Sequence, residues 1–270
     1  MNHTVLLALI ATMGTWFLTA LGAMTVIFFK KTDRKVMNMI LGFAAGVMIA
    51  ASFWSLLAPA IDRAEANASL PAWLVATLGF LFGALFMWIS DHVVSAAEYR
   101  LSCGRMVSAH QKSRLRRAVM LMLSITMHNI PEGLAVGVAF GALAAGDCPK
   151  EEIMGAVTIA VGIGLQNFPE GAAVSLPLRE EGYSRRRAFF LGQASALVEP
   201  VAGVIGALLV VTIGRILPYA LAFAAGAMIV VAVHELIPEC QKDRDVHPYF
   251  STGGIVVGFA LMMLLDVALG

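Results

Sequence analysis

Apolar residues fill eight long segments of the chain, and short polar stretches separate them. A helix needs about 20 apolar residues to cross a bilayer, and each segment is close to or above that length. The pattern therefore predicts an all-α polytopic membrane protein with eight transmembrane helices. Residues 1–270 then form a single transmembrane domain. The segments cover roughly residues 4–29, 36–60, 72–98, 119–144, 153–178, 188–213, 219–237 and 251–269.

The composition agrees with this prediction. Hydrophobic residues make up 59% of the chain and charged residues only 14%, whereas soluble domains carry about 25% charged residues. The apolar run before Lys30 is too long for a signal peptide and has no basic start, so we expect a first helix that is retained. The three cysteines lie in different loops, without the spacing of a disulfide framework or a thiolate metal site. The net charge of +1 gives no indication of a nucleic-acid partner.

The basic residues predict the orientation in the membrane. Sixteen of the 19 lie in the first, third, fifth and seventh connections. The other connections hold only Arg63, Lys150 and Arg215. Because Lys and Arg collect in cytoplasmic loops, the odd connections should face the cytoplasm and both termini the outside.

Two nearly identical motifs interrupt the fourth and fifth apolar segments. The first reads His-Asn-Ile-Pro-Glu-Gly and begins at His128. Ionisable residues inside transmembrane helices are costly and by default mark an ion or substrate pathway. On a helix, His128 and Glu132 share a face, and Asn129 is a close neighbour of Glu132. The second motif repeats this arrangement 38 residues later with Gln166, Asn167 and Glu170.

Prolines and glycines suggest how the motif helices pack. Pro131 leaves the carbonyl of Met127 without its helical partner, and Pro169 acts likewise in the fifth segment. Such irregular backbone is tolerated at membrane depth where it lines a cavity. Three glycines at intervals of four, beginning at Gly133, should let another helix approach closely. Motifs on antiparallel neighbouring helices would face each other near the midplane, as in inverted-repeat transporters.

The residue types in the motifs favour a divalent metal ion as the ligand. Imidazole suits zinc, iron, nickel and copper, and carboxylate or amide oxygens suit harder divalent ions. Weak amide ligands also fit a site that must release its ion. Glu199, which Pro200 follows, is a third carboxylate within an apolar segment and a further candidate. His234 and Glu235 form either an interfacial cap or a release station, and we expect Asp91 to be interfacial.

The paired motifs, the eight segments and the outside termini resemble the ZIP family of zinc and iron transporters. Gln166 at the start of the second motif, together with His234 and Glu235, resembles its bacterial GufA-type branch. The resemblance implies a 3+2+3 inverted-repeat bundle in the inner (plasma) membrane. It also implies a homodimer that moves zinc into the cytoplasm by an elevator-like motion, with Fe²⁺, Mn²⁺ and Cd²⁺ as further candidate cargoes.

The resemblance further implies a binuclear metal centre between the fourth and fifth helices. Many relatives have His where this chain has Gln166, and Asp is frequent in this branch where it has Asn167. The second ion position therefore loses a charge. The first position would use His128, Glu132, Gln166 and Glu170, with Met48 nearby. The second would use Asn129, Glu132, Asn167, Glu170 and Glu199.

Two other functions compete with metal uptake as readings of these residues. An intramembrane metalloprotease needs His-Glu-x-x-His, but Pro238 stands where the second histidine should follow His234. We therefore expect no enzyme. A proton-coupled exchanger of another cation would use the same intramembrane carboxylates, and the sequence leaves this alternative open.

Overall fold

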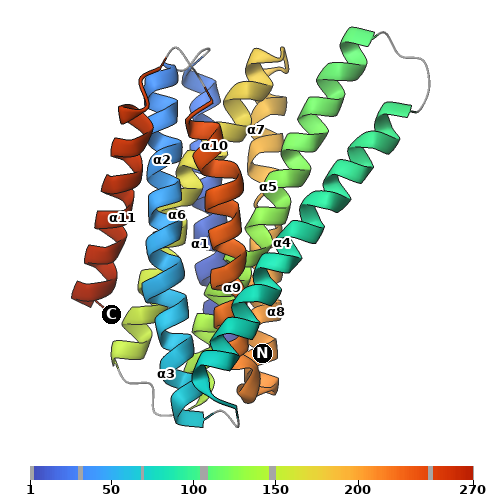
Figure 1. Cartoon of the computed structure of the whole chain (residues 1–270). Coiled ribbons are helices and arrows are strands. Elements are labelled where there is room, and N and C mark those ends of the chain that lie inside the picture. The colour runs from blue at the N-terminus through green and yellow to red at the C-terminus, as the bar shows by residue number, and fades with distance from the viewer. Residues whose placement is uncertain are drawn as a thin grey trace.

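The chain folds into a bundle of helices (Figure 1). This computed structural model describes residues 3–29, 33–67, 70–103, 109–145, 150–242 and 246–269. Within these ranges it contains no strand, so the all-α class is confirmed. The basic stretch expected in residues 99–118 has side chains that lie outside the described part of the structure.

The helices coincide with the predicted apolar segments, apart from shifts at their ends. Shorter elements complete the bundle: η1 (Ser52–Leu57) and η4 (Ala232–Leu236) are π-helical turns, beside α3 (Ala58–Asn67), α7 (Arg185–Ala194) and α10 (Ile237–Cys240). The long helices are α1 (His3–Phe28), α2 (Arg34–Ala51), α4 (Ala72–Cys103), α5 (Ala109–Ala142), α6 (Lys150–Glu180), α8 (Val198–Thr212), α9 (Leu217–Val231) and α11 (Tyr249–Leu269).

Six helical stretches of the described chain are long and apolar enough to cross a membrane. Helices α5 and α6 are not among them. Both carry a polar motif in mid-helix and charged residues at one end or both, which lowers their mean hydropathy. The six stretches are His3–Phe28, Arg34–Ala66, Ala72–Val93, Arg185–Thr212, Gly214–Cys240 and Tyr249–Ala268.

A short turn lies within the sixth predicted segment, which still forms one membrane-compatible stretch, Arg185–Thr212. Helix α7 ends at Ala194 and α8 begins at Val198, which puts Glu199 and Pro200 in the first turn of α8. Proline is tolerated there because the first-turn N–H groups have no helical acceptor. By contrast, α5 and α6 continue through Pro131 and Pro169.

Glycines bring the helices of one group into backbone contact. A Cβ on Gly133, Gly137 or Gly141 of α5 would strike the backbone of α8, which confirms the close approach expected from their spacing. Gly22 of α1 lies equally close to the backbone of α6. Helices α1, α5, α6, α7 and α8 form this group, which we call the motif bundle.

A second group is joined in the same way. Gly42 and Gly46 place α2 against the backbone of α11, and Gly83 places α4 against α9. We call α2, α3, α4, α9, α10 and α11, with η1 and η4, the flanking bundle. Between the two bundles, Gly162 of α6 faces the flexible side chain of Met262 in α11 instead of backbone.

Candidate metal centre

The residues expected to bind metal are all withdrawn from the surface. None of the eight is more than 6% exposed, although seven of them are polar or charged. Such side chains are seldom buried unless they are paired or functional. The eight are Met48, His128, Asn129, Glu132, Gln166, Asn167, Glu170 and Glu199.

A direct contact joins the two motifs. The Gln166 side-chain nitrogen donates to Glu132 Oε1 over 2.7 Å, across the boundary between α5 and α6. The remaining oxygens, Glu132 Oε2 and Gln166 Oε1, are buried without a hydrogen-bond partner among the described residues. The Asn167 Oδ1 atom and both amide atoms of Asn129 share this condition. The oxygens among these atoms are free of any hydrogen bond from the described residues and could accept a further partner.

Leaving such atoms unpaired is costly. A buried polar group without a partner destabilises a fold by about 1–3 kcal/mol, and native proteins contain few of them. Their concentration in the two motifs fits an ion-binding role better than a structural one, because a cation would satisfy several of these oxygens at once.

Glu199 has a different environment. Its Oε2 atom accepts a hydrogen bond from the Thr15 hydroxyl over 2.5 Å. The Asn167 side-chain nitrogen donates to both carboxylate oxygens over 2.9 Å each. Thr15 was not predicted from the sequence. The available signal is a line of buried threonines in an otherwise apolar helix, at positions 12, 15 and 19.

His128 points towards the flanking bundle. Its Nε2 atom lies 2.5 Å from Glu235 Oε1 of η4. The ligand atoms of Asp91, His128 and Glu235 all lie within 4.8 Å of one another. Across the described chain this is the one compact group of three or more such ligand residues, and the three glutamates of the motif bundle do not form another.

This cluster adds a contact that was not expected for Asp91. The apolar span of α4 ends at Val93, so Asp91 lies near its end as the sequence suggested. Its carboxylate is also grouped with the motif histidine. His234 is exposed, and its Nε2 atom lies 3.5 Å from Asp91 Oδ2. Of the two residues expected on a release path, Glu235 therefore contacts the motif directly and His234 lies at its edge.

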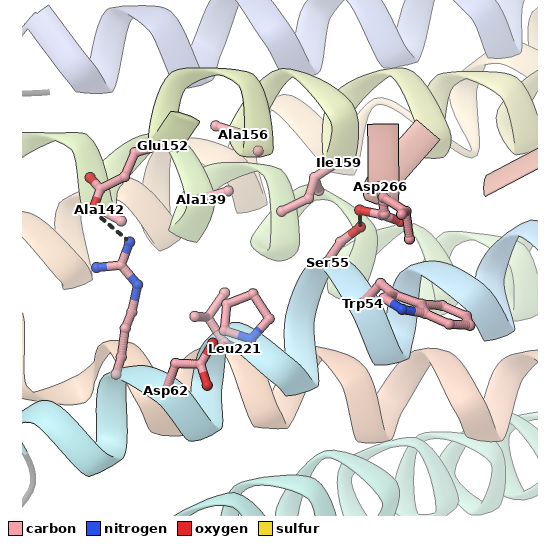
Figure 2. Close-up of a pocket in the computed structure, with 14 residues that line it drawn as sticks. Trp54, Ser55, Asp62, Ala139, Ala142, Glu152, Ala156, Ile159, Leu221 and Asp266 are labelled. Atoms are coloured by element: carbon pink, nitrogen blue, oxygen red, sulfur yellow. Dashed lines mark hydrogen bonds and ion pairs between the residues drawn. The ribbon is translucent and has the colours of Figure 1, made fainter. Parts of the chain in front are cut away.

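A cavity of about 440 Å³ opens at the α3 end of the bundle. Figure 2 shows its acidic residues Asp62, Glu152 and Asp266, with Ser55 donating to Asp266 over 2.5 Å. Arg63 also lines it and lies 3.4 Å from Glu152. On α6 the cavity reaches Ile159, which is seven residues, or about 10 Å of helix, before Gln166.

Known proteins resemble this chain over most of its length. The family model of the ZIP zinc transporter matches residues 101–266. "Zinc transporter ZIP11" of Bos taurus is 40% identical, with 97% of both chains covered. "Zinc transporter GufA" of Myxococcus xanthus is 35% identical and covers 97% of this chain and 98% of its own. "Zinc transporter ZIPB" of Bordetella bronchiseptica is 37% identical over 93% of this chain and 78% of its own. With its paired motifs buried between α5 and α6, the chain belongs to the ZIP family of zinc transporters.

Proposed function

We propose that this protein carries zinc into the cytoplasm through the site between α5 and α6. Family membership makes it a transporter of divalent metal and not an enzyme. The observation that carries the proposal is the contact of Gln166 with Glu132. The second carboxylate oxygen of Glu132 and the amide oxygen of Gln166 have no hydrogen-bond partner among the described residues. A site of nitrogen and oxygen ligands can also bind Fe²⁺, Mn²⁺ and Cd²⁺, and these ions are proposed as secondary cargoes.

Two ion positions are proposed for this centre. The first position combines one imidazole with carboxylate and amide oxygens, a set that binds zinc without the tight closure of a structural site. The second has oxygen ligands only, and both glutamates bridge the two. The first uses His128, Glu132, Gln166 and Glu170 beside Met48, and the second uses Asn129, Asn167 and Glu199 with the same glutamates.

The cavity and the Asp91 cluster lie at opposite ends of the proposed path. The acidic cavity would raise the local concentration of cations outside the membrane. After passing the motifs, the ion would meet Asp91 and Glu235, which lie within reach of His128. The histidine can then leave the ion for a carboxylate that it already contacts in this structure.

The two bundles suggest how access alternates. Within each bundle, backbones touch at glycines and resist separation, whereas Gly162 and Met262 meet through a flexible side chain at the boundary. We propose that the motif bundle slides against the flanking bundle in an elevator-like cycle. Eight crossings with both termini outside, a homodimer and a location in the bacterial inner membrane complete the proposal.

Uptake into proteoliposomes tests this function. Purified protein should accumulate Zn²⁺, and a panel of Fe²⁺, Mn²⁺ and Cd²⁺ should show weaker uptake. Glu132→Ala and Glu170→Ala should each abolish uptake, because each glutamate serves both ion positions. Glu239→Ala is the matched control, since this exposed residue pairs with Lys242 away from the motifs.

Two results would contradict the proposal. Normal zinc uptake by either motif variant at equal protein density would remove the ion from this site. Transport of another cation that depends strictly on a proton gradient, without zinc uptake, would favour the exchanger.

A further inference from the structure

We propose that Thr15 and Asn167 hold Glu199 in a hydrogen-bonded clamp, so that a second ion binds much more weakly than the first. This inference rests on the proposed function and concerns the occupancy of its two ion positions. It assigns Thr15 as a positioning residue of the metal centre.

The geometry places the Asn167 amide where a chelated ion would lie. Its nitrogen is 2.9 Å from Glu199 Oε1 and 2.9 Å from Oε2, so it straddles the carboxylate symmetrically. A carboxylate only accepts hydrogen bonds, so the amide must present its NH₂ group to it. A metal that approached both oxygens would have to displace this group.

The rest of the carboxylate is also satisfied. The Thr15 hydroxyl donates to Oε2, and Glu199 lies in the first turn of α8, where the helix dipole favours a negative charge. Thr15 is 2% exposed, and both Glu199 and Asn167 are fully buried. Neutral hydrogen-bond donors thus stabilise the buried charge of the Glu199 carboxylate, which would otherwise need a cation beside it.

The other asparagine of the paired motifs provides the contrast. Asn129 holds the equivalent place in α5, yet both of its amide atoms lack a partner among the described residues. Gln166 offers its open oxygen to the first position, and Glu132 offers one that both positions share. An ion at the first position displaces no protein donor from these two oxygens, whereas an ion at Glu199 must break the clamp. The clamp therefore weakens the second position alone.

Zinc titration of the purified protein by calorimetry measures the effect. We expect one tight ion per chain and a second that binds at least about 10-fold more weakly, the scale on which neighbouring hydrogen bonds change metal affinity. Asn167→Asp should tighten the second ion by about 10-fold or more, because the amide donor is replaced by a carboxylate.

Asn129→Asp is the comparison variant. It adds the same charge to another ligand of the second position but leaves the clamp intact, so it should tighten the second ion clearly less than Asn167→Asp does. Thr15→Val removes one donor while keeping the side-chain shape, and it should also tighten the second ion. Thr15→Ser keeps the hydroxyl and should behave as the natural protein. A normal affinity for the first ion would show that the variant is correctly folded.

Several outcomes would overturn the clamp. These are two equally tight ions in the natural protein, equal effects of the two Asp variants, or an unchanged second ion in a Thr15→Val protein whose first ion binds normally. Each is compatible with normal zinc uptake. Failure of the proposed function would look different, since neither ion would bind and no uptake would occur.

Discussion

At the residue scale, the buried polar atoms of the centre fall into two kinds. The protein itself satisfies the Glu199 carboxylate through Thr15 and Asn167. Glu132 Oε2 and Gln166 Oε1 have no hydrogen-bond partner among the described residues. Because an unpaired buried group costs about 1–3 kcal/mol, an ion that binds the open oxygens also stabilises the fold.

Glu235 should govern release from the first position. Its carboxylate lies 2.5 Å from His128 Nε2 and so competes with an ion for the imidazole. We expect Glu235→Gln to tighten zinc binding and to slow maximal uptake, each by about 10-fold. The exposed neighbour Glu239, substituted in the same way, should leave both quantities unchanged. Faster uptake, or a loss of zinc affinity in Glu235→Gln, would contradict a role in release.

The sequence predicted the motif residues but not their neighbours. His128 and Glu132 stand out because polar residues are costly in an apolar segment. Thr15 does not stand out, since a threonine can bond to its own helix, and its partner Glu199 is 184 residues away. Asp91 was expected near the end of its apolar segment, where it lies. Its grouping with His128 and Glu235 could not be predicted, because the three residues come from elements far apart in the sequence.

At the element scale, the prolines of α5 and α6 lie in mid-helix, whereas the proline of α8 follows a short turn. Pro131 and Pro169 lie deep inside α5 and α6, which pass through them. Pro200 lies in the first turn of α8, just after the short turn that follows α7. The apolar pattern predicted the span over residues 188–213 but not this turn, because a hydropathy pattern does not distinguish a proline that begins a helix from one inside it.

Gly137→Ala should destabilise the protein. Its Cβ would lie 2.7 Å from the Gly203 Cα of α8, and a backbone cannot move aside as a side chain can. Overpacking of this kind costs about 1–3 kcal/mol. Gly14→Ala is the control, because a Cβ at Gly14 meets nothing within 4 Å. Thermal unfolding of the purified variants should show a lower midpoint for Gly137→Ala alone, and equal midpoints would disprove the close approach.

At the scale of the whole molecule, the boundary between the bundles is crossed by polar contacts near both ends. Glu235 meets His128 on one side, and Arg63 of α3 meets Glu152 of α6 at the cavity. If the motif bundle slides, both contacts must break and reform, so their strength sets part of the balance between the inward-facing and outward-facing states.

Breaking the Arg63 contact should favour the outward-facing state. The two side chains are 31% and 39% exposed, and such a pair is worth about 1 kcal/mol at most, which is about a fivefold change in an equilibrium. In a protein without native cysteines, Arg63→Ala should raise the rate at which an impermeant reagent labels an Ala156→Cys reporter in the cavity. Arg63→Glu combined with Glu152→Arg should restore it. Identical labelling rates in all three proteins would show that the contact between Arg63 and Glu152 does not affect the balance between the two states.

The glycine contacts also bear on how the protein is made. The glycines of α2 meet the backbone of α11, and those of α4 meet the backbone of α9. In both pairs the partner helix is synthesised much later than the first helix. Contacts between distant parts of a chain slow folding, because a long loop must close before they contribute. The flanking bundle therefore cannot close before α11 has been synthesised. Until then, the glycine face of α2 is available to lipid, to a chaperone or to a neighbouring nascent chain.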